Sequence, residues 1–170
     1  TKDKWITNYR SRKLTQLLRS RYQAIISTSK SINKDNSLLN CRIDGLNDKS
    51  PDLIIIDRYL KLKKNLRIFK DKTKRSIYIF TIKNDKEKIN WFRRNNIKVI
   101  QLSNMSKKDD YKKILMYMSR KGYYRIFVEA GLTYINFLIK NKLLDNIFIF
   151  KSFFKLRKKG KNNSNIKSIK

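Results

Sequence analysis

Two arginines in the first quarter of the chain have the chemistry to hold a phosphate group. Arg19 falls late in an expected helix, and Arg42 follows the polar stretch beyond the next expected strand. A guanidinium group can donate two parallel hydrogen bonds to a phosphate, and each well-placed charged hydrogen bond contributes ~1.5–3 kcal/mol. In a chain this basic, an isolated arginine is more often a surface charge, so neither residue identifies a site alone.

A second candidate is the turn Glu129-Ala130-Gly131, which closes an expected strand and opens an expected helix. Gly131 leaves the first backbone N–H groups of that helix accessible, and the helix dipole favours an anion there. The diphosphate of a dinucleotide is the natural occupant. A tight turn with a solvated glutamate would have the same sequence, and one glycine is a weak signal.

Asp35 is a third candidate, because the chain has only 13 acidic residues against 43 Lys and Arg. It stands beside Asn36 in the polar stretch after a strand, where a carboxylate could accept hydrogen bonds from ribose hydroxyls. A turn-forming aspartate is the alternative at this position, and on its own it is the more common one.

The elements that must position these residues alternate between helix and strand. Leu14, Leu17 and Leu18 recur at helical spacing behind Thr7, which is the expected N-cap of the first helix. The pattern predicts helices at 8–21, 85–95 (with Asp85 as N-cap), 109–120 (ended by Gly122) and 132–141, and strands at 24–26, 53–57, 76–82, 98–102, 124–128 and 146–150.

This alternation predicts βαβ units and an α/β fold with a mainly parallel central sheet and helices on both faces. Residues 27–36 are expected to form the loop that leaves the first strand. Ligands in such sheets lie beyond the carboxyl ends of the strands. That rule selects the 27–36 loop, the Asp57-Arg58 end and the turn at 129–131.

Composition fits one domain, which we place at 1–154, followed by a basic and flexible tail at 155–170. The net charge of +30 would suit a nucleic-acid partner. The lysines are scattered, however, and Lys, Asn and Ile are abundant together, as in proteins from AT-rich coding sequences. We therefore favour compositional drift and anionic ligands over dedicated nucleic-acid binding.

The chain has one cysteine and no histidine, which excludes a disulfide framework and a Cys/His zinc site within it. Acid–base chemistry would have to come from carboxylates, Lys, Tyr or water. No run approaches the ~18 apolar residues of a membrane span, and no signal peptide is visible, so we predict a cytoplasmic protein without a membrane partner. Thr1 is not an initiator methionine, and we expect the chain to be part of a longer protein.

The order of these residues is more specific than any one of them. It resembles the reductase domain of the bifunctional riboflavin-biosynthesis deaminase–reductase, and the resemblance extends to about Ser152. The matching residues are Lys4-Trp5-Ile6-Thr7, Arg12, Arg19, Ala24-Ile25-Ile26, Asp35-Asn36, Leu39, Arg42, the run from Val128 to Thr133, and Leu143-Leu144-Asp145.

The resemblance implies a dihydrofolate-reductase-like fold, a homodimer, and the NADPH-dependent reduction of 5-amino-6-(5-phosphoribosylamino)uracil to its open-chain ribityl form. By position, the substrate residues would be Asp3, Arg19, Leu39, Arg42 and Glu129. The NADPH residues would be Trp5, Ser31, Asp35, Arg58, Gly131, Leu132, Thr133, Tyr134, Ile135, Asn136 and Phe137. Arg58 would reach the 2′-phosphate of the cofactor.

The chain departs from the family pattern at several positions. Ser31 replaces a threonine and keeps its hydroxyl, whereas Ser37 and Leu132 replace prolines. The family's first strand and a zinc deaminase domain are expected upstream, so we expect an unpaired edge in the sheet. Two alternatives stay open: a degenerate relative without activity, and a basic nucleic-acid-binding module that stacks bases on Tyr123-Tyr124 or Phe153-Phe154.

Overall fold

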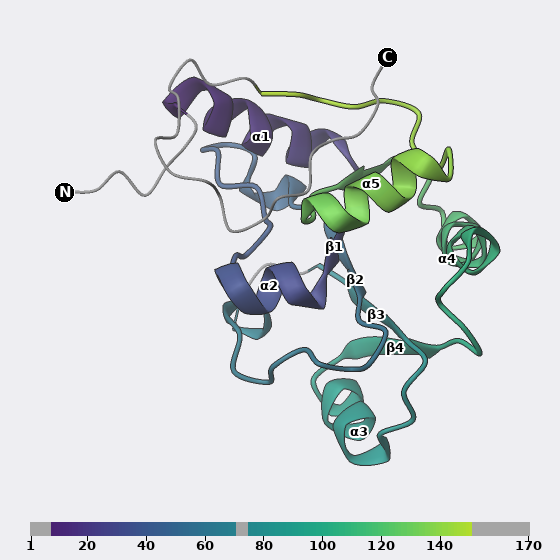
Figure 1. Cartoon of the computed structure of the whole chain (residues 1–170). Coiled ribbons are helices and arrows are strands. Elements are labelled where there is room, and N and C mark those ends of the chain that lie inside the picture. The colour runs from purple at the N-terminus through teal and green to yellow at the C-terminus, as the bar shows by residue number, and fades with distance from the viewer. Residues whose placement is uncertain (1–7, 71–74, 151–170) are drawn as a thin grey trace, which may run out of the picture.

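A five-stranded parallel sheet forms the framework of the computed structural model, which describes residues 8–70 and 75–150 (Figure 1). The strand order is β4-β3-β2-β1-β5, and all four pairings are parallel. The predicted parallel α/β sheet is therefore confirmed. The strands are β1 (Ala24–Thr28), β2 (Asp52–Ile56), β3 (Ile77–Thr81), β4 (Ile97–Gln101) and β5 (Ile126–Val128); the α-helices are α1 (Tyr9–Arg21), α2 (Ser29–Asp35), α3 (Lys86–Arg94), α4 (Lys108–Arg120) and α5 (Leu132–Lys140).

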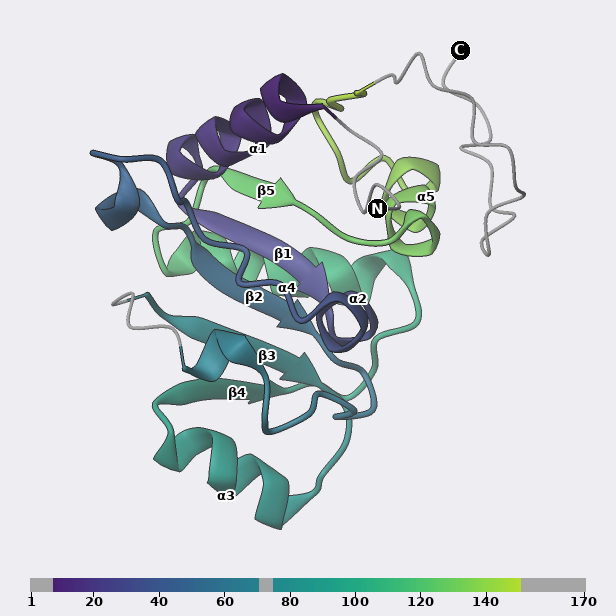
Figure 2. The same cartoon turned by 90° about the vertical axis from the view of Figure 1, so that its left-hand side faces the viewer.

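Helices cover both faces of this sheet, as the alternation of elements predicts (Figures 1 and 2). Successive strand residues point to opposite faces, so each apolar strand supplies two cores. On one face, Ile25 and Ile55 pack with Ile32 of α2 and Phe92 of α3. On the other face, strand residues pack against α4 and α5, with Ile54, Phe80, Ile114, Met118 and Tyr134 in one cluster.

The helix ends are fixed by local hydrogen bonds. Asp85 caps α3 as predicted, since its Oδ1 accepts from the backbone nitrogen of Lys88 at 3.0 Å. The N-cap of α1 is Asn8 and not the predicted Thr7, because the Asn8 Oδ1 accepts from the nitrogen of Ser11 at 2.9 Å. Asparagine and threonine are both good caps, and a one-residue shift in a helix start is common in sequence-based prediction.

The predicted loop at 27–36 is wrong, because β1 continues to Thr28 and α2 follows it directly. The Thr28 side chain accepts from the backbone nitrogen of Ser31 at 3.2 Å and so caps α2. Ile32 anchors this helix in the core. Ser, Asn and Asp have modest helix propensity, so the sequence SKSINKD gives little local signal of a helix.

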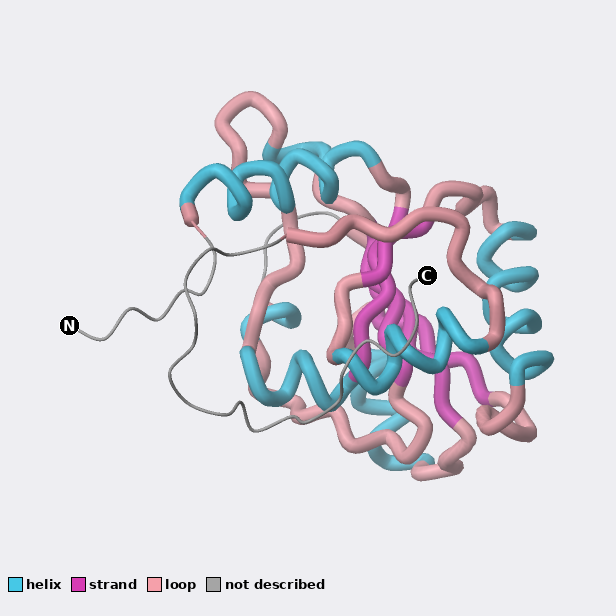
Figure 3. Tube along the Cα trace, turned by 45° about the horizontal axis from the view of Figure 1, so that its top comes forward, coloured by secondary structure: helices cyan, strands magenta, loops and turns pink. Residues whose placement is uncertain are grey.

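The predicted strand at 146–150 is also wrong, because these residues pair with no strand in the described part of the chain (Figure 3). The side chains of Ile147, Phe148 and Ile149 are 43%, 49% and 53% exposed. A continuous apolar segment such as 147–150 becomes a strand only when its backbone hydrogen-bonds to a neighbouring edge. The outer edge of β5 likewise has no strand partner within residues 8–70 and 75–150.

Two other predictions concern the C-terminal tail and the absence of membrane-spanning helices. The proposed basic tail at 155–170 lies outside the described residues. In the described residues, no helix is long and apolar enough to cross a membrane.

Candidate functional site

The candidate site lies at the carboxyl ends of three neighbouring strands. β1 leads into Ser31, β5 leads into Glu129, and β2 leads into Arg58. The backbone nitrogen of Glu129 donates to the carbonyl of Ile26 at 2.9 Å, which holds the end of β5 against β1. Figure 2 shows the strand arrowheads pointing towards α2 and α5. The structure therefore gathers the turns that the sequence selected.

Ser31 and Gly131 meet at the start of α5. The Ser31 Oγ accepts from the backbone nitrogen of Gly131 at 3.2 Å and lies 3.1 Å from the Thr28 Oγ1. Among the residues that the structure describes, no side chain caps α5, and the first turn of this helix carries no acidic residue. The N–H groups of Leu132 and Thr133, in the first turn of this helix, are therefore available to an anion.

The predicted cofactor stretch from Gly131 to Phe137 divides into two parts. Gly131 and Thr133 are exposed at the open helix start. The rings of Tyr134 and Phe137, by contrast, lie 5.9 Å and 4.6 Å from the ring of Tyr111 on α4. Burial raises the pKa of Tyr134. The remaining members of the stretch, Leu132, Ile135 and Asn136, are partly buried.

Arg19 and Glu129 form a two-pronged ion pair across 110 residues of sequence. The Arg19 Nε donates to one carboxylate oxygen at 2.9 Å and its Nη2 donates to the other at 2.6 Å. The Arg19 Nη1 donates to the backbone carbonyl of Asn40 at 3.0 Å. The arginine side chain is 8% exposed and the glutamate side chain 33%. Two of the predicted substrate residues thus contact each other.

The segment 39–42 carries the other two described substrate candidates. Leu39 has a left-handed backbone with φ of 53°, and its side chain is buried in the core. Arg42 is exposed, and its backbone nitrogen donates to the Gln16 side chain of α1 at 3.1 Å. The structure therefore presents the Arg42 guanidinium to solvent beside α1, while Leu39 offers no side-chain surface to a ligand.

Arg58 is held at the end of β2 by contacts that the sequence did not indicate. Its Nη2 donates to the Ser106 Oγ at 2.6 Å, and its guanidinium lies 5.2 Å from the centre of the Tyr59 ring. The preceding residue, Asp57, is buried and accepts from the backbone nitrogens of Lys61 and Leu62, both at 2.8 Å. An aspartate at the end of an apolar strand signals such a turn, whereas nothing in the sequence points to Ser106.

Asp35 is exposed at the end of α2. Two neighbouring asparagines connect this helix to the loop after β2, a role that sequence reasoning did not predict for either of them. Asn33 donates to the carbonyl of Lys61 at 2.9 Å and accepts from the nitrogen of Lys63 at 3.0 Å, while Asn36 accepts from the nitrogen of Arg67 at 2.9 Å. The predicted Asp3 and Trp5 lie outside the described residues.

Comparison with known proteins identifies the family. Residues 1–152 match the RibD C-terminal domain. The chain belongs to this family. The predicted resemblance to the reductase domain of riboflavin synthesis is therefore confirmed.

Relatives of the RibD C-terminal domain differ in length. A protein of Buchnera aphidicola subsp. Acyrthosiphon pisum named 5-amino-6-(5-phosphoribosylamino)uracil reductase is 29% identical over 158 residues, covering 86% of this chain and 73% of that protein. The riboflavin biosynthesis protein RibD of Buchnera aphidicola subsp. Baizongia pistaciae is 28% identical, covering 88% of this chain and 42% of that protein.

The solved structure of RibD from Acinetobacter baumannii superposes on this chain with a TM-score of 0.67 and 19% sequence identity. The match covers 85% of this chain and 38% of the RibD chain. The chain thus spans about two fifths of the two RibD proteins. The predicted dihydrofolate-reductase-like α/β fold is confirmed by this likeness.

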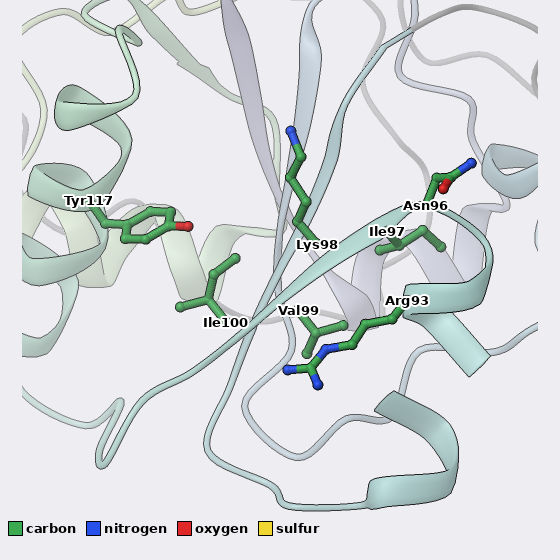
Figure 4. Close-up of a pocket in the computed structure, with 7 residues that line it drawn as sticks. All are labelled: Arg93, Asn96, Ile97, Lys98, Val99, Ile100 and Tyr117. Atoms are coloured by element: carbon green, nitrogen blue, oxygen red, sulfur yellow. The ribbon is translucent and has the colours of Figure 1, made fainter. Parts of the chain in front are cut away.

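A groove of about 430 Å³ lies elsewhere on this RibD C-terminal domain, along β4, which is an edge strand of the described sheet (Figure 4). Arg93 of α3 and Tyr117 of α4 line it, and Lys98 stands on the strand between them. The Lys98 Nζ donates to the hydroxyls of Ser76 and Tyr78, both at 3.1 Å. None of the predicted site residues within 8–70 and 75–150 lines this groove, and a lysine on an edge strand discourages pairing with another chain.

Proposed function

We propose that this chain reduces 5-amino-6-(5-phosphoribosylamino)uracil to its ribityl form in riboflavin synthesis, with NADPH as the reductant. The observation that carries this proposal is the meeting of two features at one edge of the sheet. The open start of α5 lies beside Ser31, and Glu129 stands two residues before Gly131 with its carboxylate held by Arg19. A helix start that suits an anion and a carboxylate are thus neighbours in a member of the RibD C-terminal domain family.

The residues at the start of α5 fit a dinucleotide. Gly131 carries no side chain there, and the helix start has neither a capping side chain nor an acidic residue to repel a phosphate. The backbone N–H groups of Leu132 and Thr133 would hold the diphosphate of NADPH, Gly131 would leave room for it beside them, and Arg58 would hold the 2′-phosphate. Ser31, Asp35 and Trp5 would contact the remainder of the cofactor. When bound, NADPH supplies the hydride for the reduction.

The chain's own residues would bind and orient the substrate. The exposed guanidinium of Arg42 suits the 5-phosphate, since a guanidinium can donate two hydrogen bonds to phosphate oxygens. The carboxylate of Glu129 suits the hydroxyl or amino groups of the substrate. Arg19, the backbone at Leu39 and the side chain of Asp3 complete the proposed substrate residues. Holding both reactants in one geometry is the main contribution of the protein to this reaction.

Four accompanying statements stay predictions: a homodimer, a cytoplasmic location, a deaminase domain elsewhere in the full-length protein, and the absence of a nucleic-acid partner. Each follows from the family resemblance or from composition.

Oxidation of NADPH, followed by absorbance, tests the proposed function. The full-length protein is mixed with the phosphorylated aminouracil substrate, and turnover is expected. Arg42→Met should raise KM by roughly one to two decades, because one charged hydrogen-bonding group contributes ~1.5–3 kcal/mol. Arg94→Met, on the exposed surface of α3, is the matched control and should leave KM unchanged.

Three outcomes separate the alternatives. Turnover that depends on Arg42 supports the reductase. A folded protein that binds NADPH without turnover corresponds to the degenerate relative. A protein that does not bind NADPH, but binds nucleic acid with steep salt dependence, overturns the proposal.

A further inference from the structure

We propose that Ser106 positions Arg58 for the 2′-phosphate of the dinucleotide, and that this contact sets the preference of the site for NADPH over NADH. The inference rests on the proposed function and adds to it a residue from the loop between β4 and α4, where no site residue was predicted. Two observations carry it: the hydrogen bond from Arg58 to Ser106, and a buried donor of Arg58 that has no acceptor in the described part of the chain.

The backbone of Arg58 is fixed where β2 leaves the sheet. Its carbonyl accepts from the backbone nitrogen of Ile82 and from the Thr81 Oγ1, both at 3.1 Å. Only β1 lies between β2 and β5, so the ends of these two strands are two strand spacings, or about 10 Å, apart. A ribose and an arginine side chain together can bridge that gap. A dinucleotide whose diphosphate lies at the start of α5 can therefore bring its 2′-phosphate to Arg58.

Most of the Arg58 guanidinium is left for a ligand. A guanidinium has five N–H donors, and the one hydrogen bond described for this side chain runs from Nη2 to the Ser106 Oγ at 2.6 Å. The Nε is buried and has no partner within residues 8–70 and 75–150. Buried donors without an acceptor are uncommon because they are costly, and a phosphate oxygen would satisfy this one. The Tyr59 ring beside the guanidinium is 54% exposed, so it is free to turn aside for a ligand.

No carboxylate neutralises Arg58 in the part of the chain that the structure describes. Asp57, the preceding residue, uses both oxygens to accept from backbone nitrogens of the turn after β2. Asp110, beside Ser106, accepts from the backbone nitrogens that begin α4. A cation without a counter-ion in the protein attracts a 2′-phosphate, whereas the neutral 2′-hydroxyl of NADH gains much less from it.

Ser106 is itself held by two hydrogen bonds. Its Oγ donates to the Asn104 Oδ1 at 2.8 Å, and its backbone nitrogen donates to the Asp110 Oδ2 at 3.0 Å. Because the single hydroxyl proton is directed at Asn104, the oxygen accepts from Arg58, and Ser106 acts on a phosphate only through that arginine. An arginine loses rotamer freedom when it binds a ligand. Ser106 restricts that freedom in advance, and such preorganisation raises affinity.

Dissociation constants of NADPH and NADH, measured by calorimetry with the full-length protein and without substrate, test this role. We expect the wild type to bind NADPH more tightly. Ser106→Ala should raise the Kd of NADPH by roughly 3- to 10-fold, the effect of one net hydrogen bond, and change that of NADH by less than about twofold. Ser106→Thr keeps the hydroxyl and should retain the preference. Ser103→Ala, at an exposed serine of the same loop without a described contact to Arg58, is the matched control.

A double-mutant comparison identifies the route of the effect. Arg58→Met alone should raise the Kd of NADPH by roughly 10- to 100-fold, because it removes a charged hydrogen-bonding group. In that background, Ser106→Ala should change the Kd of NADPH by less than about twofold further, since the group that it positions is gone. An effect of Ser106→Ala that persists undiminished without Arg58 would contradict the positioning role.

The outcomes separate this inference from the proposed function. A wild-type protein that binds neither dinucleotide would remove both. A wild type that binds NADPH and NADH equally, or a Ser106→Ala variant with an unchanged ratio of the two constants, would overturn the inference and leave the reductase standing. A Ser106→Ala variant that loses affinity for both dinucleotides by the same factor would show that the serine serves only the structure of the loop, which also overturns it.

Discussion

The side-chain oxygen of Ser31 lies 3.2 Å from the backbone nitrogen of Gly131, although 100 residues separate them. The contact joins the start of α2 to the start of α5 at the edge of the sheet where β1 and β5 end. A hydroxyl accepts the hydrogen bond here, so no charge is placed at the positive end of α5. The helix start is thereby ordered but not neutralised, which is the condition that an anionic ligand requires.

Gly131→Ala tests whether this glycine serves the fold or a ligand. Gly131 has φ of −68° and ψ of 154°, and an added Cβ would meet only the Ser31 Oγ, at an ordinary 3.6 Å. Alanine restricts the unfolded chain, which stabilises the fold, but it is a poorer N-cap than glycine, so we expect the free energy of unfolding to change by less than about 1 kcal/mol. Urea unfolding measures this. A clear destabilisation would show that the backbone there is strained, and a loss of NADPH affinity without destabilisation would identify a ligand contact.

Asp57 is expected to be essential for the turn after β2. Its two carboxylate oxygens accept from the nitrogens of Lys61 and Leu62, and the residue is buried. Asp57→Ala would leave the buried Leu62 donor unsatisfied, at a cost of about 1–3 kcal/mol in the free energy of unfolding. Asp57→Asn keeps one acceptor and should lose less. Asp48→Ala, at an exposed position, is the control and should change stability by less than about 0.5 kcal/mol.

Lys142→Gly should stabilise the protein. Lys142 follows α5 with φ of 52°, a left-handed conformation that costs a residue with a Cβ roughly 1–2 kcal/mol. Its side chain is exposed, so little packing is lost. We expect a higher midpoint of thermal unfolding. The matched variant Lys140→Gly, at an exposed position inside α5, should lower stability by about 1 kcal/mol, and a Lys142→Gly variant that behaves like it would contradict this assignment.

The carboxyl group of Asp110 makes the free energy of unfolding depend on pH. Hydrogen bonds from the backbone nitrogens of Lys107 and Ser106, at 2.9 Å and 3.0 Å, hold the pKa of its carboxyl below the usual value of 3.8. The carboxylate form is favoured in the folded state, so its contribution is present above that value and is lost as the pH falls through the lowered pKa. Unfolding measured at a series of pH values below about 5 should show a shallower loss of stability for Asp110→Asn than for the wild type.

The sheet could be predicted from the sequence because its strands carry strong local signals. The run Leu53-Ile54-Ile55-Ile56 is buried on both faces, and such continuous apolar runs are typical of parallel sheets. The helix α2 has no comparable signal. It contributes Ile32 to the core, and its asparagines bond to the loop after β2, so tertiary contacts that are distant in sequence determine its conformation.

The candidate site could be predicted in its location but not in its internal contacts. The carboxyl-end rule selected the turns that meet at β1, β2 and β5. It could not pair Arg19 with Glu129, because 43 basic residues compete for 13 acidic ones and sequence spacing does not reveal partners 110 residues apart. The predicted strand at 146–150 failed for a related reason, since a strand depends on an edge elsewhere in the fold.

The parallel pairing of β1 with β5 also bears on how the chain folds in time. On one side of β1, strands β2, β3 and β4 follow one another in sequence order. On its other side β1 pairs with residues 126–128, which come much later in the chain. Closing a loop of ~100 residues costs about 4 kcal/mol of chain entropy, so this pairing is expected to form late. A nascent chain that has not yet reached β5 therefore exposes the backbone edge of Ala24, Ile25 and Ile26, and at that stage the polypeptide is most open to aggregation or to capture by a chaperone.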